Sequence, residues 1–217
     1  MTARGVFLSF EGGEGSGKST QISILTKTLE LAGLQVVLAR EPGGTRLGEA
    51  VRALLLDPAT GDVDSRAELL LYEASRAQLT REIIQPALAT GAVVLCDRYY
   101  DSSTAYQGYG RGLPISEIEA LNSSATGGLV PDMTLLLDGD HQRGMDRATT
   151  EGTDRLEAAG DEFHSRVRHG FLRIAEAEPL RVKVIDAEGT PEQVALRVLA
   201  SVRTIPVLAL VLSEAGL

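Results

Sequence analysis

Cysteine, tryptophan and lysine are scarce in this chain of 217 residues. It contains one cysteine, no tryptophan and only three lysines among its 21 basic residues. The single cysteine, Cys96, excludes an internal disulfide, and the three histidines lack the spacing of a zinc site. A chain without disulfides fits a reducing compartment, so we expect a cytoplasmic location.

Positive charge and long apolar segments are also in short supply. The formal net charge is -9, the wrong sign for a protein that coats nucleic acid or an anionic membrane with its whole surface. The most apolar segment, 205–212, is interrupted by Pro206 and is far shorter than the ~20 residues that span a bilayer, so we expect it to pack or to form an interface. We expect no nucleic-acid partner and no membrane partner, and any bound phosphate must be held locally.

The sequence does contain short apolar runs that alternate with longer segments whose apolar residues recur every three or four positions. The apolar runs lie at residues 6–10, 36–39, 93–96, 133–137 and 182–185. The expected helices span residues 19–32, 45–56, 66–89, 116–123, 162–177 and 191–202. This alternation predicts an α/β fold, with a five-stranded parallel sheet flanked by helices on both faces in one domain over residues 1–217.

The first apolar run is followed by a glycine-rich segment, GGEGSGKS at residues 12–19. It matches the phosphate-loop pattern G-x-x-x-x-G-K-[ST] between a strand and a helix. In such a loop the backbone N–H groups surround phosphate oxygens, the lysine bridges the outer phosphates, and the hydroxyl ligates Mg²⁺. We therefore expect an ATP site with Lys18 as a catalytic cation and Ser19 as a metal ligand. The expected phosphate-binding residues are Gly12, Gly13, Glu14, Gly15, Ser16, Gly17, Lys18, Ser19 and Thr20.

Other segments narrow the reaction that this loop serves. A guanine-nucleotide switch would need an Asn-Lys-x-Asp motif, but the only asparagine, Asn122, is followed by two serines. Instead, REPGGT at 40–45 and DRYY at 97–100 place charged side chains at strand ends, where α/β sheets bind ligands. The segment SSTAYQG at 102–108 adds hydroxyls, an aromatic ring and an amide.

With these segments the chain resembles the thymidylate kinase family, whose members phosphorylate dTMP from ATP. The motifs that carry the resemblance are FEGGEGSGKST, REPGGT, DRYYDSSTAYQG, GLVPDMTLLLD and DRLE, which run from the first strand to the last helix. The resemblance implies a P-loop NTPase fold with a mobile lid, dTMP and ATP as substrates, Mg²⁺ as a cofactor, and a homodimer.

The resemblance also implies roles for residues around the acceptor phosphate. Arg40 and Arg98 resemble the arginines that hold the dTMP phosphate. Asp97 resembles the carboxylate that supports Mg²⁺ and the arginine, and an acid that ends an apolar strand beside a phosphate loop fits this role. Glu14 matches the acidic residue beside the sugar and phosphate of the acceptor.

A second group of matched residues surrounds the base and the sugar. Tyr72 matches a ring that stacks on thymine and Arg76 a side chain that donates to its carbonyl, although from spacing alone this pair could be a core-edge contact. Tyr106 matches the ring beside C2′ of the deoxyribose. Ser103 and Gln107 match polar contacts to base and sugar.

The segment 149–160 (TTEGTDRLEAAG) is polar, contains glycine and lacks an apolar stripe, as is typical of a lid. Family members carry a catalytic arginine in the phosphate loop or in the lid, and this loop has Gly15 at that position. The remaining lid cations are Arg147 and Arg155, and we expect Arg155 to act on the transition state.

The other polar residues have simpler interpretations. Cys96 is expected to be a buried small hydrophobic residue. Asp138 is expected to be structural or to support residues that contact the ligand. The expected surface residues are His141, His164, His169, Glu49, Glu68, Glu73 and Glu82. Two alternative functions are a P-loop kinase for another deoxynucleoside or nucleoside monophosphate, and a nucleotide sensor without turnover.

Overall fold

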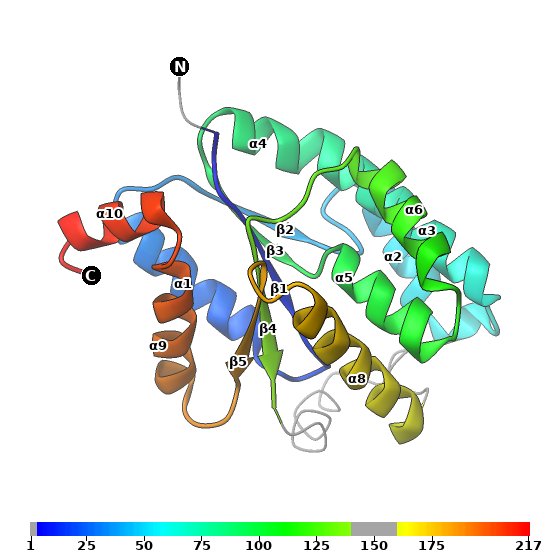
Figure 1. The fold of residues 1–217 in the computed structure, drawn as a ribbon. Helices are drawn as coiled ribbons and strands as arrows, with labels where there is room; N and C mark the ends of the chain where they lie inside the picture. The colour runs from blue at the N-terminus through cyan, green and yellow to red at the C-terminus, as the bar shows by residue number, and fades with distance from the viewer. Residues whose placement is uncertain (1–3, 140–159) are drawn as a thin grey trace.

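The structure is a computed structural model that describes residues 4–139 and 160–217. These residues form a five-stranded parallel sheet in the order β2-β3-β1-β4-β5, with helices on both faces (Figure 1). The strands are β1 (Phe7–Glu11), β2 (Val36–Arg40), β3 (Val93–Asp97), β4 (Met133–Asp138) and β5 (Val182–Asp186). The predicted α/β architecture and all five predicted strands are confirmed.

The strand register brings the polar strand ends together. In the sheet Phe10 pairs with Asp97, and Arg40 pairs with Asp97 from the other side. Because all strands run in parallel, their carboxyl ends lie at one edge, where the phosphate loop follows β1 directly. The site is therefore assembled at this edge.

Helices cover the sheet in two groups. The helices are α1 (Lys18–Leu31), α2 (Arg46–Leu56), α3 (Ser65–Leu79), α4 (Gln85–Ala89), α5 (Tyr100–Ser103), α6 (Ile115–Thr126), α8 (Asp161–Ala177), α9 (Pro191–Val202) and α10 (Pro206–Glu214), with a short 3-10 turn η1 (Pro58–Thr60) and two π-helical stretches, η2 (Thr80–Ile84) and η3 (Thr104–Gly110). Helices α1, α9 and α10 lie on one side of the sheet, and α3, α4, α5, α6 and α8 on the other (Figure 1).

The helix predicted over residues 66–89 is interrupted. It continues through the wider turns of η2 between α3 and α4. Pro86, near the start of α4, has no N–H and its ring crowds the carbonyl one turn earlier, so a widened turn at this point accommodates it. The helical segments α5 and η3, which follow β3, are not anticipated by the sequence pattern.

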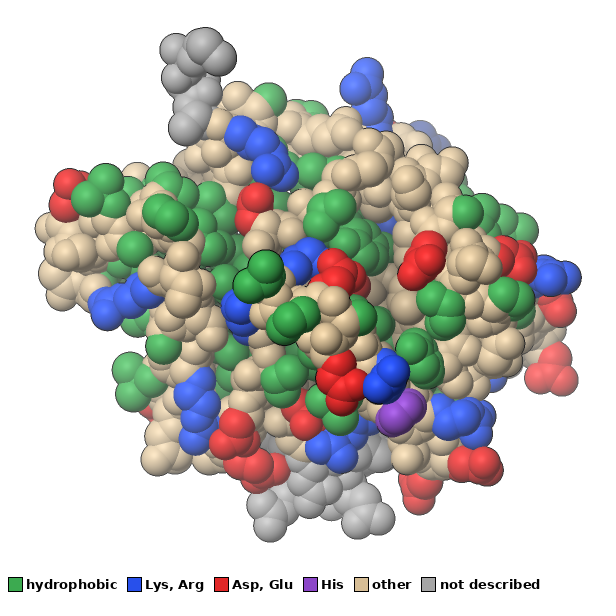
Figure 2. All heavy atoms as spheres, viewed as in Figure 1, with side chains coloured by type: hydrophobic (Ala, Val, Ile, Leu, Met, Phe, Trp, Pro, Cys, Tyr) green, Lys and Arg blue, Asp and Glu red, His purple; other side chains and the backbone are tan. Residues whose placement is uncertain are grey.

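The apolar C-terminal segment forms α10, which packs on the protein as expected. Leu208 and Leu212 are buried against α1 and α9, while Val207 and Leu210 are exposed, and green side chains gather over α10 in Figure 2.

Within the described residues, no single helix has the length and apolar composition to cross a membrane. Helices α9 and α10, bent by 120° at their junction, meet that criterion only as a pair.

Candidate active site

The phosphate loop is shaped by glycines with a positive φ. Gly12 has a φ of +136°, and a Cβ there would lie 2.4 Å from the carbonyl oxygen of Leu137. Gly17, with a φ of +93°, is the N-cap of α1. Among the described residues no side chain caps this helix, in contrast to α2, α3 and α9. Its first N–H groups are therefore available to an anion.

Lys18 lies in the first turn of α1 and is buried. Its Nζ donates to the carbonyl oxygens of Gly12 and Gly13, at 3.2 and 2.8 Å, and lies 3.5 Å from the Ser16 hydroxyl. Burial and the nearby charge of Arg98 lower the pKa of Lys18. The ammonium group is thus held inside the curve of the loop by neutral acceptors, which phosphate oxygens can replace.

Two oxygen atoms that can bind a metal ion lie close together beside the loop. The hydroxyl of Ser19 donates to Oδ2 of Asp97 at 3.4 Å. A hydroxyl and a carboxylate are hard oxygen ligands, and Mg²⁺ is commonly bound by one or two protein oxygens together with phosphates and water. No group of three or more His, Cys, Asp or Glu side chains able to hold a metal occurs among the described residues. Ser19 and Asp97 fit Mg²⁺ that is bound together with a nucleotide, and this metal site stays a prediction.

Arg98 links the phosphate loop to the next part of the site. Its guanidinium donates to the Gly12 carbonyl at 2.9 Å and to Oε1 of Glu14 at 2.5 Å, and it lies over the ring of Tyr106 at 5.1 Å. The Tyr106 hydroxyl donates to the same Glu14 oxygen at 3.3 Å. Sequence reasoning had assigned these three side chains to one site, and the structure places them together.

A pocket opens beside Arg98 and Glu14. Six of the residues that line it were predicted from the sequence to bind the substrate: Glu14, Tyr72, Arg98, Ser103, Tyr106 and Gln107. The pocket is also lined by Glu41, Pro42, Arg52, Leu56 and Ser102. We call this the acceptor pocket. Sequence reasoning missed Arg52 because α2 carries it two turns beyond REPGGT. The hydrogen bond from its Nη1 to the Pro42 carbonyl, at 3.0 Å, turns the side chain back toward that motif.

Two predicted residues do not line the acceptor pocket. Arg76 is buried behind it, where its guanidinium donates to Glu41, Glu73, Ser103, Asn122 and the Tyr99 carbonyl. Arg40 lies at the sheet edge as expected, but its guanidinium pairs with Glu49 at 2.9 Å. The direct contacts of Arg76 and Arg40 with the acceptor stay predictions.

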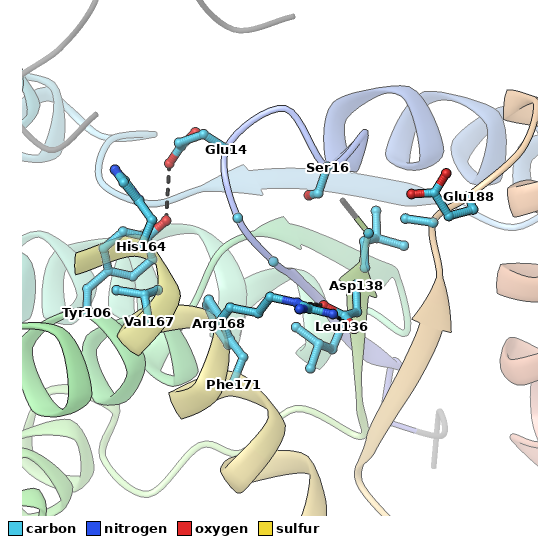
Figure 3. A pocket seen from close by; sticks show the side chains of 15 residues that line it. Glu14, Ser16, Tyr106, Leu136, Asp138, His164, Val167, Arg168, Phe171 and Glu188 are labelled. Atoms are coloured by element: carbon cyan, nitrogen blue, oxygen red, sulfur yellow. Dashed lines mark hydrogen bonds and ion pairs between the residues drawn. The ribbon is translucent and has the colours of Figure 1, made fainter. Parts of the chain in front are cut away.

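A second pocket lies on the other side of the phosphate loop. Its lining combines loop residues with β4, α8 and the loop before α9, and includes Gly12, Gly13, Glu14, Ser16, Tyr106, Asp138, His164, Arg168 and Glu188. Figure 3 shows Glu14 and Tyr106 in contact, and Arg168 from α8 paired with Asp138. We call this the donor pocket. Glu14 and Tyr106 line both pockets, so the two adjoin at the phosphate loop.

Comparison with known proteins agrees with this geometry. The family model "Thymidylate kinase" matches residues 10–198. The chain is 52% identical over 198 residues to a thymidylate kinase of Solidesulfovibrio magneticus, covering 88% of this chain and 95% of that protein. It is 49% identical over 201 residues to a thymidylate kinase of Deinococcus radiodurans, and the match covers 92% of this chain and 97% of that protein. The crystal structure of thymidylate kinase from Ehrlichia chaffeensis superposes with a TM-score of 0.77, at 37% identity, over 92% of this chain and 99% of that chain.

The chain belongs to the thymidylate kinase family. It is a kinase, and its reaction is the phosphorylation of dTMP with ATP as the phosphoryl donor. The P-loop NTPase fold expected from the resemblance is confirmed. The alternatives, a kinase for another acceptor and a sensor without turnover, are not favoured.

Three carboxyl groups in or beside the site have pKa values far from the usual one. Burial alone would raise the pKa of Glu14, but the charges of Arg98 and Lys18 and the Tyr106 hydrogen bond lower it to about 2. Burial raises the pKa of Glu11 to about 8, with Asp101 adding to the rise. Burial also raises the pKa of Glu41 to about 7 despite the charge of Arg76.

Three residues expected at the surface are buried, so those expectations were wrong. His164 lines the donor pocket, because the first turn of α8 packs against Tyr106 and the phosphate loop. Glu68 is covered by η3, whose Gln107 donates to it at 3.0 Å, and by Arg111. Glu73 faces Arg76 one turn along α3. His169, Glu49 and Glu82 are exposed and Cys96 is buried, as expected.

Arg147, Arg155, His141 and all of the expected lid except Gly160 lie outside the described residues.

Proposed function

We propose that the acceptor pocket binds dTMP and that the donor pocket and phosphate loop bind ATP. The observation that carries this assignment is the position of Arg98, which bonds to the Gly12 carbonyl in the phosphate loop and also lines the acceptor pocket. A cation at that junction can contact both the acceptor phosphate and the transferring group. Arg52, Arg40 and Arg98 are the proposed contacts of the dTMP phosphate.

The chemistry needs alignment and positive charge rather than a covalent intermediate. An oxygen of the dTMP phosphate attacks the γ-phosphorus of ATP, the bond to the β–γ bridging oxygen breaks, and that oxygen leaves with the electron pair on ADP. Lys18, the N–H groups at the start of α1, and Arg98 stabilise the charge on the transferring group. Glu14 holds the Arg98 guanidinium in place through the hydrogen bond described above.

Mg²⁺ is the proposed metal cofactor, held by Ser19 and Asp97. When bound, it neutralises charge on the β- and γ-phosphates. Asp97 pairs with Arg40 and Phe10 in the sheet, so its backbone position is fixed by two neighbouring strands.

Base selection is proposed to rest on Gln107, Arg76 and Tyr72. The Nε2 group of Gln107 donates to Glu68, which leaves its Oε1 as an acceptor for N3–H of thymine. Cytosine has no hydrogen at N3, and an amino group where thymine has O4, so Arg76 would face a donor. Tyr72 lines the pocket and is the proposed stacking ring.

Tyr106 is the proposed ring beside C2′, and Ser103, Glu14 and Gln107 are the proposed polar contacts to sugar and base. The chain is proposed to act as one kinase domain in the cytoplasm, with a lid at about residues 149–160 and two copies forming a homodimer.

Steady-state ADP release with a panel of acceptors tests this assignment. An unpaired polar group costs about 1–3 kcal/mol, so we expect kcat/KM for dTMP to exceed that for dCMP by at least about tenfold. Gln107→Ala should lower this ratio of kcat/KM values. Gln78→Ala should not, because Gln78 is a half-buried glutamine of α3 that donates to Glu82 and does not line the acceptor pocket. Equal kcat/KM for dTMP and dCMP in the unmodified enzyme would contradict the proposed base contacts.

A further inference from the structure

Arg98 has an unusual backbone conformation. Its φ is +67°, and it is the one non-glycine residue with a positive φ in the described part of the chain. A side chain in the left-handed region is strained, so neighbouring groups must hold it there. This conformation occurs at the residue that links the phosphate loop to the acceptor pocket.

The groups that hold this turn come from β1. The Arg98 N–H donates to the Phe10 carbonyl at 2.9 Å, which continues the sheet. The next N–H, that of Tyr99, donates instead to the side chain of Glu11, at Oε1 and 2.8 Å. Glu11 is fully buried, so water cannot take over this hydrogen bond.

The second oxygen of Glu11 reaches the guanidinium of Arg98 through one hydroxyl. Ser102 Oγ donates to Oε2 of Glu11 at 2.6 Å and accepts from Nη1 of Arg98 at 3.3 Å. The same Nη1 donates to the Gly12 carbonyl, one residue beyond Glu11. Glu11 therefore contacts the backbone after Arg98 directly and the Arg98 side chain through Ser102.

We propose that Glu11 is a positioning residue for phosphoryl transfer, which holds the Arg98 turn in its left-handed conformation and fixes the guanidinium between the acceptor and donor pockets. This inference rests on the proposed role of Arg98. Glu11 itself does not touch either nucleotide in this scheme, and it acts only through Tyr99 N–H and Ser102.

Two substitutions of Glu11 distinguish its hydrogen bonds, which hold the turn, from the negative charge of its carboxylate. Burial favours the neutral form of this carboxyl group, whose pKa is raised to about 8. Glu11→Gln keeps the shape and an oxygen that accepts from Tyr99 N–H, so it should rescue the function. Glu11→Ala removes both contacts and leaves the turn without its acceptor.

Steady-state kinetics of these variants, with dTMP and ATP varied separately, test the proposal. We expect Glu11→Ala to raise KM for dTMP by about tenfold and to lower kcat, with KM for ATP changed by less than about twofold. Glu11→Gln should stay within about threefold of the unmodified enzyme in kcat/KM. Thr134→Val is the matched control: its buried hydroxyl contacts Ser9, Asp101 and Arg181 but not the Arg98 turn, so it should lower stability without changing KM for dTMP.

A double-mutant cycle separates this proposal from the proposed role of Arg98. Arg98→Ala should impair kcat/KM on its own, and adding Glu11→Ala should then cost less than about twofold more. If Arg98→Ala has no effect, the proposed function of Arg98 is wrong. If Arg98→Ala impairs the enzyme but the two losses multiply, or Glu11→Ala behaves like Thr134→Val, the positioning role is wrong.

If Glu11→Ala does not fold, Ser102→Ala gives the same test. We expect it to raise KM for dTMP by about threefold, and an unchanged KM would contradict the proposal.

Discussion

At the scale of single residues, the site depends on carboxyl groups that are buried beside arginines. Arg76 lies between Glu41 and Glu73, and one oxygen of each carboxylate has no hydrogen-bond partner within the described residues. Such a cluster is costly to desolvate and is stable only while the charges stay balanced. This balance makes the protonation of Glu41 matter for stability.

Glu41 and Glu11 predict a pH-dependent stability. Folding raises the pKa of Glu41 from 4.5 to about 7 and the pKa of Glu11 from 4.5 to about 8. Between pH 4.5 and these raised values, the folded state therefore binds more protons than the unfolded state. The contribution is complete below pH 4.5 and is lost as the pH rises through 7 and 8. We therefore expect the free energy of unfolding in urea to fall from pH 5.5 to pH 8.0, by up to about 1.4 kcal/mol per pH unit for each group.

Two variants identify the source of this slope. Glu41→Gln should flatten the dependence on pH, because it removes one of the two titrating groups. Glu49→Gln should not, because Glu49 is exposed and its pKa is lowered by hydrogen bonds from Gly44 and Arg40, out of this range. An unchanged slope in Glu41→Gln would show that Glu41 does not titrate in this window.

A further prediction at this scale concerns Arg155 and Arg147, the two arginines expected in the proposed lid. We expect Arg155→Ala to lower kcat by about 10²-fold with little change in KM for dTMP, because a cation that engages the transferring group stabilises the transition state. Arg147→Ala is the matched comparison. Single-turnover rates at saturating ATP and dTMP should show the larger loss for Arg155, and a larger loss for Arg147 would reverse the assignment.

At the scale of elements, the turn from β1 into α1 depends on backbone shape. Gly12 and Gly33 both have a positive φ, but only at Gly12 would a Cβ meet another backbone atom, the Leu137 carbonyl oxygen. Because β4 approaches the loop closely at this point, the loop can keep its path only with a residue that lacks a Cβ.

Alanine substitutions separate the two effects of these glycines. Gly33→Ala should cost about 1 kcal/mol of stability, from the left-handed conformation alone, and leave kcat/KM unchanged. Gly12→Ala should displace the loop or β4 and reduce kcat/KM by at least about tenfold. Thermal unfolding and ADP release measured on both variants check this, and equal activities would show that the loop tolerates the displacement.

At the scale of the whole molecule, exposed leucines offer a surface for the proposed homodimer. Leu47 and Leu54 on α2 and Leu70 on α3 are about half exposed, and these two helices pack against each other. Exposed large apolar side chains on two adjacent helices are a candidate interface between two copies.

Light scattering coupled to size exclusion tests this pairing. We expect the unmodified chain to elute as a dimer, and the double variant Leu54→Glu and Leu70→Glu to elute as a monomer of 23.1 kDa. Leu210→Glu, on the exposed side of α10, is the control and should stay dimeric. If Leu210→Glu alone separates the copies, the interface lies on α10 instead.

Local sequence was enough to predict the five strands, the main helices and the positions of Lys18, Ser19 and Asp97. These follow from the period of apolar residues and from a loop motif whose contacts lie within a few residues, so local sequence contains the needed information. The burial of Glu68, Glu73 and His164, and the place of Arg52 in the acceptor pocket, depend instead on contacts between segments that are distant in the sequence. A polar residue on a helix is predicted to be exposed, because the local sequence does not show which distant segment will pack over it. In this structure η3 packs over Glu68. The role of Glu11 has the same origin, because its partners, Tyr99 and Ser102, reach it only through the pairing of β1 with β3.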